Sequence, residues 1–139
     1  MKLIFRSEHV DKKLKVVTGW AYVARNEKGE AVYDQGYDTT IDPEELEKAF
    51  FAYMLNSGQI DLMHNEVTIG RVCGGLVTTK QMQQAMGITN PIKEGIFFSV
   101  RIDDDATWEE VERGNLPMFS IGGRGRLEEV ESGEEAEEV

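Results

Sequence analysis

The hydrophobic and polar residues of the chain alternate in short runs, a pattern typical of strands that bury one face. Residues 2–10 and 13–26 form the first two runs, and both are rich in β-branched and aromatic side chains. Residues 26–30 (NEKGE) contain the asparagine and the glycine of a hairpin turn. Further extended segments are predicted at residues 59–66, 67–79, 95–102 and 118–131.

The segment from residue 42 to residue 58 has helical spacing instead. Asp42 suits the N-cap, Pro43 the first helical position and Glu45 the third, where its side chain can complete a capping box. Gly58 suits the C-terminal end of the helix. The predicted buried face of this amphipathic helix consists of Leu46, Ala49, Phe50 and Tyr53.

Two shorter helices are predicted further along the chain. The first has Thr79 as its N-cap. The second follows three aspartates at residues 103–105, which place negative charge at the positive end of the helix dipole. Within it, Thr107 and Glu110 have the spacing of a capping box, and Gly114 stops the helix. A calcium loop would need its oxygen ligands spaced around a glycine turn, so we interpret the aspartates as a cap.

Strands outnumber helices in this order of elements, and the helices are inserted between strands. The order predicts an α+β fold with a mostly antiparallel, β-barrel-like sheet core and covering helices. We expect one domain over residues 1–130 and an acidic, disordered tail at residues 131–139. The last twelve residues hold seven glutamates and no basic residue, which is typical of a solvated tail.

Composition then narrows the class of function. The net charge of −11 argues against binding to nucleic acid or to an anionic membrane, although without the last twelve residues the chain has 15 basic and 19 acidic residues. The single cysteine, Cys73, excludes an internal disulfide, and with only two histidines it excludes a structural Cys/His zinc site. We therefore expect no metal and no cofactor. The lack of a secretory signal or a membrane-spanning run predicts a cytoplasmic protein.

Ser120, in the stretch LPMFSIGGRGR, is the candidate nucleophile. Gly122 and Gly123 follow it, and glycines let a substrate backbone approach closely and supply N–H groups to an oxyanion. Arg124 and Arg126 add positive potential for the oxyanion or the substrate. Simpler interpretations exist for each: a strand serine bonded to a neighbouring strand, and exposed arginines that balance the glutamates after them.

His64 is the candidate general base, because an imidazole can take a hydroxyl proton near neutral pH and return it to a leaving amine. The alternative is a partly buried histidine bonded to a backbone carbonyl. Cys73 is a rival nucleophile, but its strand has a buried pattern, so we interpret it as a core residue. His9 is interpreted as a surface residue. The motifs of P-loops, zincins and α/β-hydrolases do not occur in the chain.

Four segments, taken in order, carry a family resemblance: VTGWAYVAR, IDPEELEKAFFAYMLNSGQIDLMH, IGRVCGGLVTT and DDDATWEEVERGNLPMFSIGGRGR. Together they resemble the XkdF-like phage serine proteases, which are prohead maturation proteases related in fold to herpesvirus assemblin. The resemblance covers about residues 15–130. Its most specific parts are the MH pair at residues 63–64 and the FSIGG stretch at residues 119–123.

The resemblance implies a serine endopeptidase with Ser120 as nucleophile and His64 as general base. It leaves the third member of the triad open among Glu66, Glu128 and Glu129. The implied substrates are the scaffold and major capsid proteins of a phage, cleaved inside the immature head in the host cytoplasm. Neither nucleic acid nor membrane is an implied partner, and the formation of a homo-oligomer through exposed sheet edges stays open.

Two other hypotheses remain at this point. The first is a non-enzymatic capsid-assembly or scaffold module with the same fold, in which His64 and Ser120 are only structural. The second is a cysteine hydrolase that uses Cys73. The position of the His64 ring relative to the Ser120 hydroxyl would separate the first from a protease, and thiol alkylation would test the second.

Overall fold

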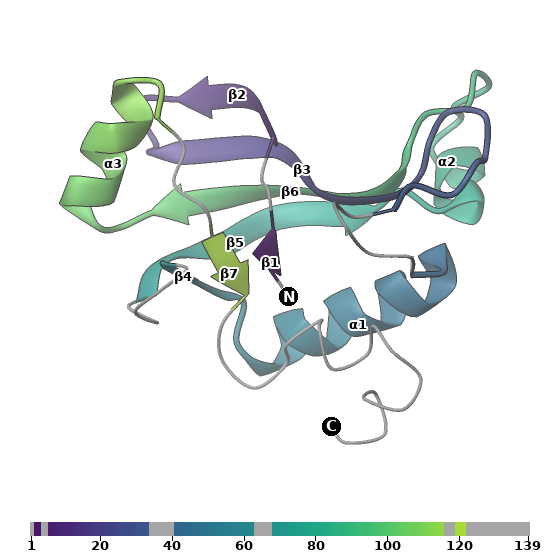
Figure 1. Ribbon diagram of the computed structural model, residues 1–139, viewed down its shortest axis with the longest axis horizontal. Coiled ribbons are helices and arrows are strands. Elements are labelled where there is room, and N and C mark those ends of the chain that lie inside the picture. The colour runs from purple at the N-terminus through teal and green to yellow at the C-terminus, as the bar shows by residue number, and fades with distance from the viewer. Residues whose placement is uncertain (1, 4–5, 34–40, 63–67, 116–118, 122–139) are drawn as a thin grey trace.

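The computed structural model describes residues 2–3, 6–33, 41–62, 68–115 and 119–121 (Figure 1). The strands in these ranges are β1 (Lys2–Leu3), β2 (Arg6–Asp11), β3 (Val16–Arg25), β4 (Gln59–Leu62), β5 (Thr68–Val77), β6 (Glu94–Ile102) and β7 (Phe119–Ile121). The helices are α1 (Pro43–Asn56), α2 (Lys80–Ala85) and α3 (Asp105–Glu112). The predicted tail at residues 131–139 and the domain boundary before it lie outside the described residues.

One antiparallel sheet joins these strands in the order β1-β7-β4-β5-β6-β3-β2. The α+β class and the antiparallel pairing are therefore confirmed. The barrel-like closure is wrong, because in the described ranges β1 and β2 are the two edges and do not pair with each other. A barrel needs a continuous ladder between its edge strands, and β1, with two residues, is too short to provide one.

The sheet is nevertheless strongly curled. Only residues 4 and 5 separate β1 from β2 along the chain, although the two strands lie at opposite edges of the sheet. Three Cα–Cα steps span at most about 11 Å, so the two edges must approach each other to that distance. In Figure 1, β1 accordingly lies beneath the long strands and not beyond them.

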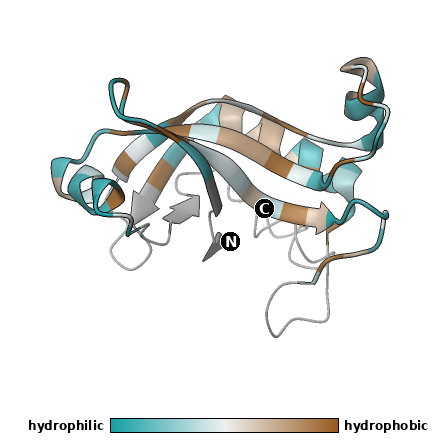
Figure 2. Ribbon diagram, turned by 90° about the horizontal axis from the view of Figure 1, so that it is seen from above, coloured by the Kyte–Doolittle hydropathy of each residue, from teal (hydrophilic) through white to brown (hydrophobic). Residues whose placement is uncertain are grey.

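Helix α1 covers one face of the sheet and builds the core with it (Figure 1). Its four predicted core residues are all buried, and the Phe50 ring packs 6.2 Å from the ring of Phe98 on β6. On β6 the even-numbered residues from Glu94 to Ile102 are all buried, whereas Ser99 is half-buried and Arg101 is exposed. Figure 2 shows hydrophobic positions mainly in the long strands and hydrophilic ones mainly in the turns between them.

The residues that cap α1 and α2 are those that the sequence predicts. Asp42 caps α1 by accepting a hydrogen bond from the Glu44 backbone N–H at 3.1 Å, and Pro43 occupies the first turn. Gly58 follows the helix with a φ of 65°, a left-handed conformation that glycine adopts without strain. Thr79 caps α2 as predicted, accepting a hydrogen bond from the Met82 N–H at 3.1 Å.

Helix α3 begins one turn before the predicted capping box. Asp104 is its N-cap, and one oxygen of its carboxylate accepts hydrogen bonds from both the backbone N–H and the hydroxyl of Thr107, at 2.9 and 2.7 Å. Glu110 instead pairs with Arg113 at 2.7 Å. The Thr107–Glu110 box is therefore wrong, because an aspartate is a stronger acceptor for the first free N–H groups than a threonine within the helix. Gly114, with a φ of 86°, ends the helix as expected.

Removal of this cap is expected to destabilise the domain. We expect Asp104→Ala to lower the midpoint of thermal unfolding by roughly 4 °C at pH 7, because two donors of Thr107 lose their acceptor. Asp105→Ala is the matched control. The Asp105 side chain is 91% exposed, so its ion pair with Lys15 Nζ at 3.6 Å contributes little to stability. Equal losses in the two variants would contradict this role of Asp104.

The same cap gives a pH dependence with a definite sign. The hydrogen bonds from the Thr107 side chain and backbone hold the pKa of the Asp104 carboxyl below its ordinary value. A carboxyl with a lowered folded-state pKa stabilises the fold above its unfolded pKa, and this contribution is lost as pH falls through the folded pKa. The difference in unfolding midpoint between the wild type and Asp104→Ala should therefore shrink below about pH 4.

Candidate functional site

Ser120 is the central residue of β7, a short strand with a neighbour on each side. Its Cα partner on β4 is Asp61, and its Cα partner on β1 is Lys2. The backbone at Ser120 thus lies inside the sheet, one strand from the β1 edge. The prediction that Ser120 lies in a strand is confirmed.

Strand β4, which pairs with β7, ends two residues before His64 in the sequence. Leu62 is the last residue of β4, its Cα partner is Phe119, and His64 follows two residues later in the sequence. His64 itself lies outside the described residues. So do the remaining predicted site residues: Glu66, Gly122, Gly123, Arg124, Arg126, Glu128 and Glu129. Their roles, and the pairing of Ser120 with His64, stay predictions.

The start of β4 is fixed by a corner between α1 and the sheet. The hydroxyl of Tyr53, which is fully buried, donates a hydrogen bond to the Gln59 carbonyl. The Gly58 carbonyl accepts from the Val72 N–H at 2.9 Å, and the Ser57 carbonyl accepts from Arg71 Nη2 at 2.8 Å. These bonds tie the C-terminal end of α1 to both β4 and β5. They therefore fix the position at which β4, the strand before His64, begins.

Cys73 differs from the interpretation as a core residue: it is exposed. The pairing of β5 with β6 shifts register between Val72 and Gly74. The shift leaves Cys73 at the bulge while Val72 stays buried, and the Cys73 thiol donates to the Ser99 carbonyl at 3.6 Å. His9 on β2 is exposed, as predicted.

Two features are absent from the residues that can be described. Across these ranges, no group of three His, Cys, Asp or Glu side chains is arranged to hold a metal ion. A search of the same residues finds no helix with the length and apolar character required to cross a membrane.

Comparison with known proteins adds one family. Residues 2–129 of the 139 match the family model described as putative phage serine protease XkdF. The matched range includes Ser120 and His64. No curated protein and no solved structure matches the chain.

Proposed function

Since the chain belongs to the family of the putative phage serine protease XkdF, we propose that it is a serine endopeptidase of phage head maturation. Its substrates are the scaffold and major capsid proteins, which it cleaves inside the immature head in the host cytoplasm. Ser120 is the nucleophile, and His64 is the general base. The acidic chain uses no cofactor for this reaction.

One observation of the fold supports the pairing of Ser120 with His64. The two residues are separated by more than fifty positions in the sequence, yet β4, which ends two residues before His64, pairs directly with β7, which carries Ser120. A nucleophile and its base must come within about 3 Å of each other, so their segments must be neighbours in the fold. The β4–β7 pairing supports this proposal, because the strand that precedes His64 lies beside the strand that carries Ser120.

The reaction follows from the chemistry of a hydroxyl and an imidazole. The Ser120 Oγ attacks the carbonyl carbon of the scissile peptide bond while His64 takes the hydroxyl proton. The tetrahedral intermediate collapses, the C–N bond breaks, and His64 returns the proton to the leaving amine. A water molecule, deprotonated by His64, then hydrolyses the acyl-enzyme and restores the serine.

The residues after Ser120 complete the proposed site. Backbone N–H groups of Gly122 and Gly123 stabilise the oxyanion, and Arg124 and Arg126 supply positive charge to it, directly or through an ordered water. A carboxylate orients the His64 ring, and Glu66, Glu128 and Glu129 are the candidates for it.

Co-expression with the scaffold and capsid proteins of the same phage tests this function. The wild type should produce defined fragments of these proteins, and His64→Ala should produce none while keeping the wild-type unfolding midpoint. Alkylation of the exposed thiol of Cys73 in lysates should leave cleavage unchanged, because Cys73 has no part in the reaction. Intact partners with the wild type, together with normal head assembly, would instead support the non-enzymatic assembly module.

A further inference from the structure

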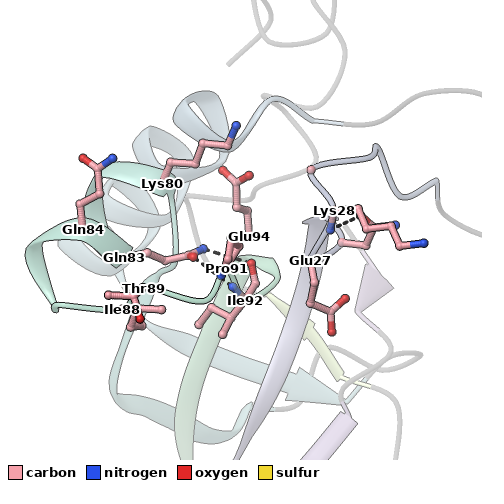
Figure 3. Close-up of a pocket in the computed structure, with 12 residues that line it drawn as sticks. Glu27, Lys28, Lys80, Gln83, Gln84, Ile88, Thr89, Pro91, Ile92 and Glu94 are labelled. Carbon is pink, nitrogen blue, oxygen red and sulfur yellow. Dashed lines mark hydrogen bonds between the residues drawn. The ribbon is translucent and has the colours of Figure 1, made fainter.

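Figure 3 shows a cavity of about 280 Å³. The strand pairing places it at the far end of the sheet from Ser120. It is lined by the turn at residues 26–29, by α2 and by the loop before β6. Ile121 follows Ser120 on β7 and is the Cα partner of Ile60 on β4. Ile60 is in turn aligned with Gly70 on β5, and Gly70 with Ile102, the last residue of β6. The cavity lies at Glu94, the first residue of β6. Because β6 has nine residues and is roughly 26 Å long, the cavity and Ser120 lie about one strand length apart.

Gln83 holds one wall of the cavity in place. Its side chain is 5% exposed, and its Nε2 donates to the Thr78 carbonyl at 2.8 Å and to the Ile92 carbonyl at 3.2 Å. Its Oε1 accepts from the Ile92 N–H at 3.1 Å. These bonds fix the loop around Ile92 against α2, so the cavity is preorganised. Ile88 and Pro91 add apolar surface to the same wall.

Glu94 is the unexplained residue of this cavity. It is 6% exposed, lines the cavity, and its carboxylate lies between Lys80 and the turn that carries Lys28 (Figure 3). No hydrogen bond or ion pair to this carboxylate occurs within the described part of the chain. Its Cα partner Arg25 is engaged elsewhere, with Nη2 3.8 Å from the Asp42 carboxylate and Nη1 donating to a backbone carbonyl.

A carboxylate that no described group pairs with can accept a cation that enters the cavity. Lys28 and Lys80 lie at the mouth of the cavity, but both are exposed, and neither is within ion-pair distance of Glu94. Their charges, like that of the exposed Glu27 beside them, are screened by solvent. Glu94 is therefore the least exposed of the charged residues that line the cavity.

We propose that this cavity binds the cationic end of a lysine or arginine side chain from a partner polypeptide. Glu94 would form a charge-assisted hydrogen bond with the ammonium or guanidinium group. The apolar wall would cover the aliphatic stem, a combination that suits an organic cation and gives a metal ion too few ligands. The proposal does not depend on the proposed protease activity, because the cavity and Ser120 lie at opposite ends of the sheet.

Binding of small probes to the intact chain tests the proposal directly. N-acetyl-L-arginine amide and N-acetyl-L-lysine amide each carry one positive charge, and N-acetyl-L-glutamine amide is the neutral control. In an amide chemical-shift titration, the two cationic probes should shift resonances of residues 26–29 and 83–94, and the neutral probe should not. Glu94→Gln should weaken binding about tenfold, the loss expected for one charge-assisted hydrogen bond.

The matched variant is Glu27→Gln, which removes the same charge from an exposed position on the same cavity. It should leave the affinity within about twofold, because an exposed charge is screened. Equal weakening by Glu27→Gln and Glu94→Gln would overturn the proposal in favour of general attraction between charges. Absence of shifts at the cavity with both cationic probes in the folded wild type would also overturn it.

Discussion

Ser120→Ala is expected to lower the rate of substrate cleavage by at least about 10⁴-fold, the scale of effect seen when a catalytic nucleophile is removed. The physical reason is that alanine has no oxygen to attack the peptide carbonyl, so the covalent route is closed. The measurement is the rate at which fragments of co-expressed scaffold and capsid proteins appear, followed by mass spectrometry of their new termini.

The fold of the variant should be unaffected. The pairing of β7 with Asp61 and Lys2 runs through backbone groups, which alanine retains. Ser99→Ala is the matched control: Ser99 is also a strand serine, and its hydroxyl is bonded to Thr18 Oγ1 at 2.6 Å. This variant should cleave at the wild-type rate. Unchanged cleavage by Ser120→Ala would assign the reaction to another residue.

Gly95→Ala should have the largest effect on stability, about 3 kcal/mol or more in the free energy of unfolding. A Cβ at this position would lie 2.0 Å from the Tyr22 carbonyl oxygen and 2.8 Å from the Val23 Cα. Both contacts are with backbone of the neighbouring strand β3, which pairs with β6 over most of its length. The two central strands would have to separate to admit the methyl group.

Equilibrium unfolding in urea measures this effect, and the chain provides a control. Gly74→Ala changes a glycine of β5, where an added Cβ would have no neighbour within 4 Å and no left-handed φ is required. Gly74→Ala should therefore change the free energy of unfolding by less than about 1 kcal/mol. Similar losses for the two variants would show that the close approach at Gly95 does not limit stability.

Local features of the fold were predictable because they depend on residues close together in the sequence. Asp42, Pro43 and Gly58 mark the ends of α1 by chemistry that acts within one turn of the helix. Thr79 does the same for α2. At α3 several acceptors lie in a row, and sequence spacing alone did not identify Asp104 as the one that caps the helix.

The errors came from contacts that the sequence does not encode locally. Closure of the sheet depends on whether its two edge strands, β1 and β2, pair with each other, and β1 instead pairs with β7, far away in the sequence. The burial of Cys73 was misjudged because a shift of one residue in the β5–β6 register changes which side chains face the core.

Only part of the candidate site could be predicted from the sequence. Ser120 and His64 were singled out by their chemistry, but the pairing of β4 with β7 joins segments too distant in sequence for periodicity to detect. Glu94 was missed, although a signal exists. It is the first of the alternating positions of β6 that face the core, and an acidic residue in such a series indicates a specific role.

Covalent labelling tests the identity of the nucleophile most directly. A fluorophosphonate reacts with an activated serine by attack of Oγ on phosphorus and loss of fluoride, and the label should be applied to material that is actively cleaving its co-expressed substrates. The proposed function predicts one adduct, on Ser120, which blocks cleavage and does not form in His64→Ala. An adduct on a different residue, or continued cleavage with Ser120 fully labelled, would contradict it.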